Sequence, residues 1–380
     1  MARPKYDPKE LEPTGEFYPG LTEGFGGMPI PPDPILQRPI SAMENIQLLV
    51  DGKRPYWIPV GGFFNADVQG FRPRINPDNI ANHQIFDGGP TYDYTGYGDN
   101  IKSWWFDLEW ITTDIGGAMF MPGKPKIPDI TEWEKYVSMP DLDKMDWDEL
   151  EAQNVEYLGT GKMNQLGIQC GLWERMMALM DVSEAAVALF DEDLKPHAHR
   201  FLDAYCNFLI DYIGRVKARC NIDCVVIHED WAHQRGPFFS AATASEMLVP
   251  YVKRIVDFCH ANGMLYEIHM CGAVEKLIPC YFEAGVDMWS AIQPLLYDTG
   301  AIVKKYKDQR FVWGITAPLI TPDYSEADMR QAAKDFVEEY KDCNIMVSFF
   351  SMDEGFPGFH PGFQNAVYEY SRIAFEDFED

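Results

Sequence analysis

The sequence predicts an α/β protein built as a (β/α)8 TIM barrel. Short apolar runs recur along the chain, and segments with one apolar helical face lie between them. Strands that are apolar throughout, separated by amphipathic helices, indicate a parallel sheet that is buried on both sides. One chain of 380 residues holds roughly eight such strand–helix units, the number that a barrel of this class contains.

The strand-like runs follow one another from residue 41 onward. They lie at 56–62, near 105–112, and at 165–172, 224–230, 264–271, 287–293, 310–316 and 344–350. The segment 243–263 is typical of the helices between them, because an apolar stripe recurs at helical spacing. The stripe consists of Leu248, Val252, Ile255, Val256 and Cys259. Thr243 and Glu246 form a capping box that predicts the start of this helix, and Gly263 predicts its end.

The first 40 residues differ in composition from the rest. They contain nine prolines and five glycines, so they cannot form a regular helix or a central strand. Their aromatic and aliphatic residues are too many for a simple linker. We therefore expect an extended arm at 1–40 that lies on a surface, either of its own chain or of the second subunit of a homodimer. The barrel domain then comprises residues 41–380.

Charge and hydropathy exclude several kinds of partner. The net charge is −27, with 59 acidic against 32 basic residues, and this field repels nucleic acid and anionic membranes. Charges interrupt every long apolar run before it reaches the roughly 18 residues of a membrane span. The N-terminus contains no apolar signal segment. We expect a cytoplasmic protein with no nucleic-acid and no membrane partner.

The eight cysteines contain no Cys-x-x-Cys pair, and most lie in apolar surroundings. Buried free thiols in a reducing compartment are the simplest interpretation. Cys271 is the exception, because it shares a strand with two other reactive side chains.

In a (β/α)8 barrel, chemistry collects at the carboxyl ends of the strands. Four of the predicted strand ends carry reactive groups: His228, Glu229, Asp230 and Trp231; Glu267, His269 and Cys271; Gln293; and Asp353 and Glu354. Because strand side chains alternate between faces, Glu267, His269 and Cys271 point the same way.

His269 and Cys271 can both reach one Zn²⁺ ion, which accepts nitrogen, sulfur and oxygen ligands. A third protein ligand from another strand end leaves one open position, as in catalytic zinc sites. The alternative is a core histidine that is hydrogen-bonded to Glu267, with Cys271 as a small apolar residue.

The stretch 224–294 resembles the uroporphyrinogen decarboxylase-like superfamily, in its branch of corrinoid-dependent methyltransferases. The similarity is carried by an acid-acid-Trp sequence at 229–231, His-x-Cys-Gly at 269–272, Glu-Ala-Gly-Val-Asp at 283–287 and Gln-Pro at 293–294. Weaker similarity extends from residue 38 to the last helix and leaves out most of the arm.

This resemblance implies a barrel with a zinc ion held by His269 and Cys271. Members that methylate thiols such as coenzyme M have a further cysteine after the last strand. Here the equivalent sequence, SMDEG, offers Glu354 and no cysteine. We therefore predict Glu354 as the third ligand, with Glu229 as the next candidate; alternatively, Glu354 is a solvated loop acid. A carboxylate in place of a thiolate makes zinc a harder Lewis acid, which favours an oxygen substrate.

The predicted function is O-demethylation. The resemblance implies transfer of a methyl group from a methoxylated aromatic, such as veratrol, to the Co(I) of a corrinoid (cobalamin) carried by a separate corrinoid protein. Asp230 or His228 would protonate the leaving oxygen. The predicted catalytic residues are His228, Glu229 and Asp230, and the predicted substrate-binding residues are Trp231, Glu267 and Gln293.

Aromatic residues are dense at 88–110, where they would line a slot for the substrate ring or, alternatively, cover the barrel mouth. Two other functions stay open. One is a methyltransferase that acts on a thiol such as coenzyme M, and the other is a uroporphyrinogen decarboxylase. The arginine-rich motif that binds porphyrinogen carboxylates is not visible, and a chain of charge −27 is a poor receptor for an anionic substrate.

Overall fold

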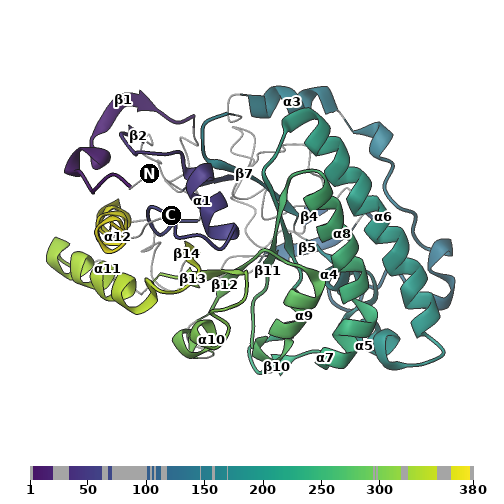
Figure 1. The fold of residues 1–380 in the computed structure, drawn as a ribbon. Helices are drawn as coiled ribbons and strands as arrows, with labels where there is room; N and C mark the ends of the chain where they lie inside the picture. Colours follow the sequence, from purple (N-terminus) through teal and green to yellow (C-terminus); the bar gives the residue numbers. More distant parts are fainter. Residues whose placement is uncertain are drawn as a thin grey trace.

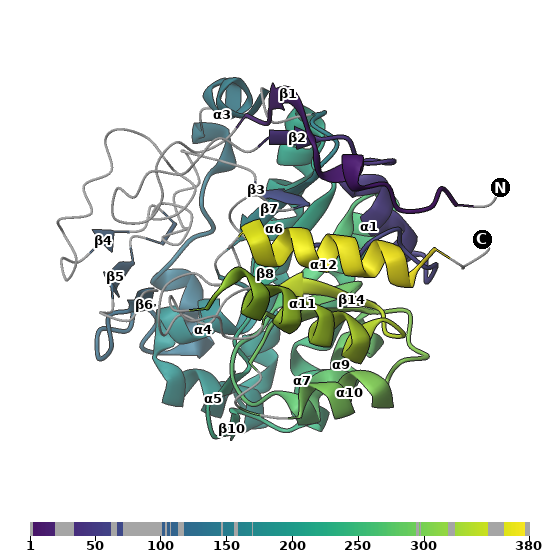
Figure 2. The ribbon, with the colours of Figure 1, turned by 90° about the vertical axis from the view of Figure 1, so that its left-hand side faces the viewer.

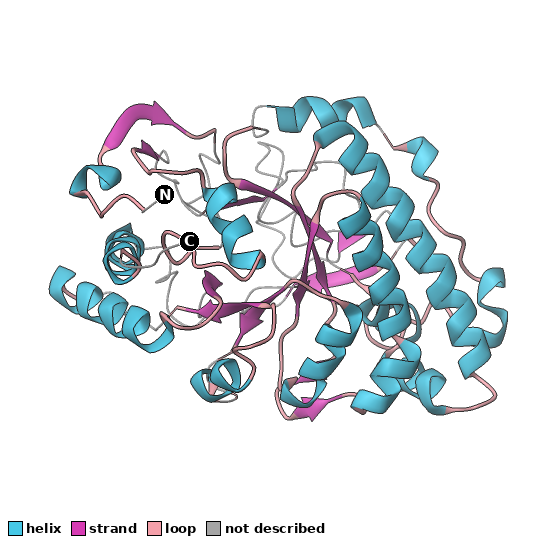
Figure 3. Cartoon of the chain, viewed as in Figure 1, coloured by secondary structure: helices cyan, strands magenta, loops and turns pink. Residues whose placement is uncertain are grey.

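The computed structural model describes residues 3–19, 34–61, 67–70, 101–102, 105–106, 108–112, 118–145, 147–155, 159–168, 170–293, 296, 298–317, 324–348 and 361–376. The strands of the largest sheet gather in the middle of the molecule, and helices lie around them (Figure 1; Figure 3).

Seven parallel strands form the main sheet, in the order β14–β13–β12–β11–β8–β7–β3. Their bounds are Val68–Gly70 (β3), Met163–Ile168 (β7), Cys224–His228 (β8), Leu265–His269 (β11), Met288–Ile292 (β12), Val312–Thr316 (β13) and Ile345–Ser348 (β14). At one edge, Val60 forms a parallel bridge with Val347 of β14. At the other edge, Asp67 donates its backbone N–H to the Val60 carbonyl at 2.8 Å.

Both edges of the sheet thus reach the segment around Val60, as the predicted barrel requires. The described residues give one backbone hydrogen bond between this segment and the residue before β3, rather than a full ladder. The predicted α/β fold with a parallel sheet is confirmed.

The predicted barrel strand near 105–112 is wrong. β5 (Glu109–Thr112) pairs antiparallel with β4 (Ile101–Lys102) and with β6 (Ala118–Phe120), in a separate three-stranded sheet. The described strand beside β7 is instead β3. An apolar aromatic run has the same appearance in a hairpin and in a buried parallel strand, so its composition cannot distinguish the two.

The amino ends of the strands close over an apolar layer. The first residues of β7, β8, β11, β12 and β13 pack together with Met346 of β14, and α1 (Ala42–Val50) covers them with Ile46, Leu49 and Val50. Because side chains alternate along a strand, positions two and four residues further on face the same way. These positions include Gln165 and then, toward the carboxyl ends, His228 and His269. The strand face that these residues share therefore changes from apolar at the amino ends to polar at the carboxyl ends, where the predicted site lies.

Helices cover the outer face of the strands. Their bounds are Trp147–Asn154 (α3), Leu172–Met180 (α4), Val182–Phe190 (α5), Lys195–Cys220 (α6), Ala241–Met247 (α7), Val249–Ala261 (α8), Ile278–Ala284 (α9), Thr299–Lys305 (α10), Glu326–Tyr340 (α11) and Pro361–Ala374 (α12). Short 3-10 helices lie at Pro8–Leu11, Ile130–Lys135, Leu142–Lys144 and Glu275–Leu277. The apolar stripe predicted between Leu248 and Cys259 is buried.

The helix predicted over 243–263 is two helices, α7 and α8. Pro250 near the start of α8 has no N–H to donate to the preceding turn, so the first helix ends before it. Ser240, rather than Thr243, caps α7: its hydroxyl accepts the Thr243 N–H at 3.1 Å. Gly263 has a φ of +67°, as predicted for a residue that ends a helix.

Two helices, α4 and α5, lie between β7 and α6 in the chain. Figure 2 shows them on the side of the sheet that also holds β4, β5 and β6, with α1 on the opposite side. Because α1 covers the amino ends of the strands, α4 and α5 lie at the carboxyl ends. Two further short strands, β9 (Ala232–His233) and β10 (Gly236–Pro237), form a hairpin after β8.

The described parts of the arm lie on their own chain. β1 (Pro13–Phe17) pairs antiparallel with β2 (Pro34–Leu36). Before them, the Glu10 carboxylate accepts two hydrogen bonds from Arg372 of α12, both at 2.7 Å, and a third from the Tyr368 hydroxyl at 2.6 Å. Glu10 and Arg372 are both buried. The structure thus shows contacts of these arm residues with their own chain, and the contact with a second subunit stays a prediction.

Within the described part of the chain, no helix is long and apolar enough to cross a membrane.

Candidate metal centre

The candidate site begins with two histidines at the ends of neighbouring strands. β8 and β11 pair in parallel, and the register places His228 opposite His269. Their rings stack with centroids 3.9 Å apart and planes at 19°. Parallel pairing without a register shift makes two side chains at the same height point to the same side. The structure therefore brings both predicted histidines together.

Cys271 follows His269 by two residues, and the Cys271 Sγ lies 3.5 Å from the His269 Nε2. Asp230 reaches the same place from the end of β8, where its carboxylate accepts the Cys271 N–H at 2.9 Å. One possible ligand atom from each of Asp230, His269 and Cys271 lies within 4.8 Å of the other two, and all three side chains are half-buried.

This donor set fits a zinc ion. Zinc binds one imidazole nitrogen, one thiolate and one carboxylate oxygen at about 2.0–2.3 Å, so ligand atoms around it stand roughly 3.5 Å apart. The Cys271–His269 separation already has this value, and Asp230 completes the group within 4.8 Å. Three protein ligands leave a fourth position for a substrate atom.

Two unusual backbone conformations hold this group in place. Asp230 has a φ of +34°, which non-glycine residues rarely adopt. Gly272 has a φ of +84°, and a Cβ at this position would lie 2.6 Å from the Ala232 carbonyl oxygen. The Gly272 N–H donates to the Gln293 side chain at 2.8 Å. The predicted substrate-binding residue Gln293 thus holds the loop that carries Cys271.

Glu229 links the end of β8 to α4. Its carboxylate accepts the N–H groups of Leu172 and Trp173 at 2.7 and 3.0 Å, and the Trp231 indole N–H at 3.1 Å. Gly171 leaves room for it, because a Cβ there would collide with the carboxyl group. Burial raises the pKa of Glu229 to about 7, although these hydrogen bonds oppose the shift. The contacts of this predicted catalytic residue are with the start of a helix and with Trp231.

Two predicted substrate-binding residues also contact the protein itself. Trp231 is fully buried beside Phe239 and Tyr281. Glu267 accepts a hydrogen bond from the Gln165 side chain at 2.5 Å, inside the sheet and below His269. The described side-chain partners of Glu267 are therefore Gln165 and Ser290. The alternative prediction had paired Glu267 with the histidine.

Burial controls the charge of the clustered groups. It lowers the pKa of His228 well below the ordinary value, and the neighbouring His269 lowers it further. Burial also lowers the pKa of His269, against the opposing charge of Asp230. It raises the pKa of the Cys271 thiol well above the ordinary value, together with the charges of Asp230 and Glu174. At neutral pH, both imidazoles are uncharged and able to bind a metal.

Glu174 was not predicted from the sequence. It lies in the first turn of α4, and burial raises its pKa well above the ordinary value, with further contributions from Asp230 and Glu229. The sequence signal was its position, an acid shortly after the strand run 165–172, but an acid in the first turn of a helix is also common for purely structural reasons.

The remaining prediction for the metal site is Glu354, which lies outside the described residues. Of the predicted ligands, the structure thus brings together His269 and Cys271. Asp230, predicted as a catalytic residue, is the third member of the described cluster.

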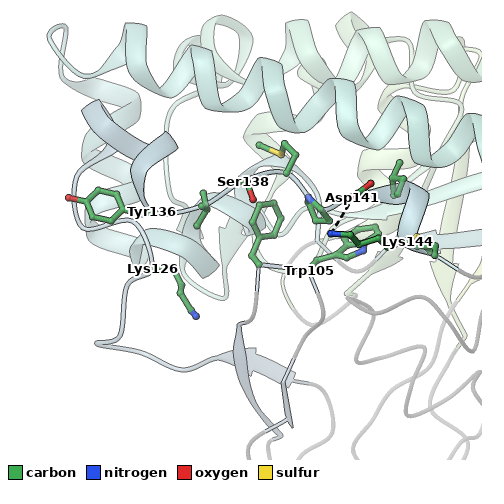
Figure 4. Close-up of a pocket in the computed structure, with 12 residues that line it drawn as sticks. Trp105, Lys126, Tyr136, Ser138, Asp141 and Lys144 are labelled. Atoms are coloured by element: carbon green, nitrogen blue, oxygen red, sulfur yellow. Dashed lines mark ion pairs between the residues drawn. The ribbon is translucent and has the colours of Figure 1, made fainter.

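A cavity of about 570 Å³ lies apart from these residues (Figure 4). Trp105 and Phe106, from the aromatic-rich stretch 88–110, line it together with Lys126, Tyr136 and Lys144. Trp105 packs edge-on against Phe208 and Tyr212 of α6. None of the clustered residues lines this cavity.

Among solved structures, the chain is similar to a methyltransferase from Methanosarcina mazei, with a TM-score of 0.59 and 14% identity over 88% of this chain and 99% of that chain. A D-psicose 3-epimerase matches with 13% identity, a TM-score of 0.34 and coverage of 60% of this chain and 82% of its own. A sugar phosphate isomerase/epimerase from Parabacteroides distasonis matches with 10% identity, a TM-score of 0.33 and coverage of 62% and 83%. No protein-family model and no curated protein sequence matches the chain. The first similarity extends over nearly the whole fold.

Proposed function

We propose that the protein is a zinc-dependent methyltransferase that moves the methyl group of a methoxylated aromatic compound to the Co(I) corrinoid of a separate protein. The observation that carries this proposal is the group of Asp230, His269 and Cys271 at the ends of two adjacent strands. The fold that the chain shares with the Methanosarcina mazei methyltransferase agrees with it, although a fold alone does not define an activity.

In this proposal, His269, Cys271 and Asp230 hold the metal. When bound there, zinc supplies a Lewis acid for an ether oxygen, so that phenolate becomes a better leaving group. Asp230 serves as the third ligand in this proposal, because its carboxylate lies within reach of both His269 and Cys271. Glu354, which lies outside the described residues, stays the ligand predicted from the resemblance. A set with one thiolate in place of two keeps the metal hard enough to prefer oxygen to sulfur.

The other residues near the cluster hold its ligands and the neighbouring elements in position. His228 stacks on His269 and fixes the plane of its ring. Because the pKa of His228 is low, this residue is uncharged at neutral pH and is a poor proton source. Gln293 holds the Cys271 loop, and Glu229 holds the start of α4. The corrinoid protein docks at the carboxyl ends of the strands, where the methyl carbon is exposed to cobalt.

A spectroscopic assay tests the proposal. Zinc-loaded protein is mixed with a Co(I) corrinoid protein and 1,2-dimethoxybenzene, and the conversion of Co(I) to methyl-Co(III) is followed by absorbance. We expect methylation of cobalt that depends on both zinc and the ether. A parallel reaction offers methyl-Co(III) and coenzyme M. Methyl transfer to the thiol, without reaction of any methoxylated aromatic, would contradict the proposal and favour the thiol methyltransferase.

A further inference from the structure

Gln293 comes directly after β12, and an irregularity in this strand decides which way its side chain points. Trp289 lies opposite Trp313 of β13. Ile292 lies opposite Ile315, so β12 has one residue more than β13 between these two pairs. Trp313 and Ile315 share a face of the sheet, because side chains alternate along a strand. Trp289 and Ile292 therefore share that face as well, and Gln293 lies on the other one.

This other face carries the metal cluster. Ser290, which follows the tryptophan of β12, lies opposite His269 of β11, so His269 and Gln293 are on the same face. There the Gln293 side chain meets the loop after β11, where its Oε1 accepts the Gly272 N–H at 2.8 Å. Gly272 is bonded directly to Cys271. The contact therefore places the Gln293 amide beside a member of the cluster.

The same contact fixes the orientation of the Gln293 amide. A backbone N–H can only donate, so the amide oxygen must face Gly272 and the amide nitrogen, Nε2, must face away from it. Within the described part of the chain, Nε2 has no hydrogen-bond partner, and the Gln293 side chain is half-buried. The N–H groups of this amide can therefore donate to a molecule that is bound next to the cluster.

The backbone around Gln293 is held as well. The Ile292 carbonyl accepts the Thr316 hydroxyl at 2.5 Å, and the Gln293 carbonyl accepts the Leu296 N–H at 3.0 Å. With its side-chain oxygen also bound, Gln293 has little freedom to turn elsewhere. A donor that is held in place before a ligand arrives loses little conformational entropy when the ligand binds.

The chemistry of this donor defines what it recognises. An amide N–H binds an oxygen acceptor. The Gln293 amide contacts the residue after Cys271 and not a ligand atom of the cluster, so it lies beside the metal position. The acceptor that it suits is therefore a second oxygen, next to the one that the metal binds. On a benzene ring, the nearest such oxygen is on the carbon adjacent to the one that carries the methoxy group.

We propose that Gln293 determines substrate specificity by donating a hydrogen bond to an oxygen next to the reacting methoxy group. The preferred substrates then carry oxygens on two adjacent ring carbons. This inference rests on the function proposed above and names the class of methoxylated aromatic that the site takes. Gln293 positions the ring and takes no part in the bond that breaks.

Gln293→Glu separates the two contacts of the amide. An ionised carboxylate has nearly the same shape and still accepts the Gly272 N–H, but it has no N–H group to donate. Gln309→Glu is the control, since it makes the same change of charge at an exposed residue before the amino end of β13. We expect both variants to bind as much zinc as the wild type, because the loop that carries Cys271 stays held.

The activity test compares 1,2-dimethoxybenzene with its isomer 1,4-dimethoxybenzene, whose second oxygen is on the far side of the ring. The quantity measured is the ratio of kcat/KM for the first isomer to kcat/KM for the second. One hydrogen bond changes binding by about 5–10-fold. We expect the ratio to fall by about this factor in Gln293→Glu, mainly through KM, and to stay at the wild-type value in Gln309→Glu.

Calorimetry gives a readout that needs no turnover. Zinc-loaded wild-type protein should bind 2-methoxyphenol about 5–10-fold more tightly than 4-methoxyphenol, because only the first has its two oxygens on adjacent carbons. Gln293→Glu should bind the two compounds equally, and the control should keep the wild-type preference.

The inference is overturned if Gln293→Glu keeps the wild-type preference for the 1,2-isomer. It is also overturned if the preference is lost together with zinc, since Gln293 would then act only by holding the loop. Absence of cobalt methylation by the wild type with every methoxylated aromatic would instead overturn the proposed function. In that case, equal binding of the two methoxyphenols by the wild type would overturn the role of Gln293 as well, and a preference that Gln293→Glu removes would support it.

Discussion

Cys271 is the residue whose protonation state decides whether a metal binds. Partial burial and the charge of Asp230 raise the pKa of its thiol well above the ordinary value, so without a metal it keeps its proton. A zinc ligand must be a thiolate, and binding therefore releases a proton. The half-buried position of Cys271 distinguishes it from six other cysteines, which are buried as the sequence predicted.

Cys271→Ala should abolish tight zinc binding and leave the fold intact, because the side chain is not part of the packed core. Cys343→Ala is the matched control, since Cys343 is the other half-buried thiol and lies outside the cluster. Metal analysis after dialysis should find about one zinc per chain in the control and in the wild type, and none in Cys271→Ala. Equal zinc in both variants would exclude Cys271 as a ligand.

Asp230→Asn distinguishes the two candidates for the third ligand. Loss of a ligand carboxylate should weaken zinc binding by more than roughly 10–100-fold. That is the loss typically seen when a residue that hydrogen-bonds to a ligand is mutated. Glu354→Gln should then change the affinity little. A chelator competition experiment measures both. The reverse order of effects would restore Glu354, the ligand predicted from the resemblance.

His269 and Cys271 were predictable as a pair, because they lie two residues apart at the carboxyl end of one predicted strand. In the structure β11 ends at His269, and Cys271 lies in the loop that follows. The role of Asp230 was not. Its direction depends on a φ of +34° and on a hydrogen bond to the N–H of Cys271, 41 residues away. Sequence spacing shows that Asp230 reaches the carboxyl end of β8, but not toward which neighbour it turns.

At the scale of the elements, the loop after β11 positions the cluster. Gly272→Ala introduces a side chain where the φ is +84° and where the Ala232 carbonyl lies 2.6 Å from the new Cβ. We expect a loss of stability of more than about 1 kcal/mol and weaker zinc binding. Gly263→Ala is the control, because its φ of +67° carries a similar backbone penalty with open space around the Cβ.

Both variants should therefore have a lower Tm, and only Gly272→Ala should bind zinc less tightly. Unchanged zinc affinity in Gly272→Ala would show that this loop does not hold the site.

The elements were predicted well where one periodicity dominates. The strand runs from 165 onward became β7, β8 and β11 to β14, because continuous apolar strands between amphipathic helices have few other solutions. The run near 105–112 failed because hairpins and parallel strands share its composition. Glu174 escaped notice because an acid in the first turn of a helix has an ordinary explanation.

At the scale of the whole molecule, the ion pair of Glu10 and Arg372 ties the beginning of the described chain to its last helix. Burial favours a raised pKa for Glu10, but the hydrogen bonds from Arg372 and Tyr368 outweigh it and lower the pKa below 4.5. A carboxyl group with a lowered pKa in the folded state stabilises the fold above its ordinary pKa. This contribution is lost as the pH falls below 4.5.

Glu10→Gln should destabilise the fold by about 3 kcal/mol at neutral pH, since it leaves the buried Arg372 without its counter-charge. The difference from the wild type should shrink as the pH falls below 4.5, because the unfolded chain then takes up a proton on Glu10 that the folded state binds only at lower pH. Urea unfolding at pH 7 and pH 4 measures both values. A difference that does not depend on pH would contradict the ion pair.

Composition predicts the partners that the surface repels, because net charge is a sum over the chain; the exclusion of nucleic acid and membrane stays a prediction. The contact of the arm with its own chain depends on the pairing of Glu10 with Arg372, which lies 362 positions away in the sequence. Such a contact leaves no periodic trace in the sequence.

The central claim is that the ends of β8 and β11 form a zinc site with one sulfur ligand. X-ray absorption at the zinc edge of the metal-loaded protein tests it most directly. We predict one sulfur at about 2.3 Å and the remaining nitrogen and oxygen ligands at about 2.0–2.2 Å. The sulfur contribution should vanish in Cys271→Ala. A zinc ion without any sulfur ligand in the wild type, or a protein that binds no zinc, would contradict the account.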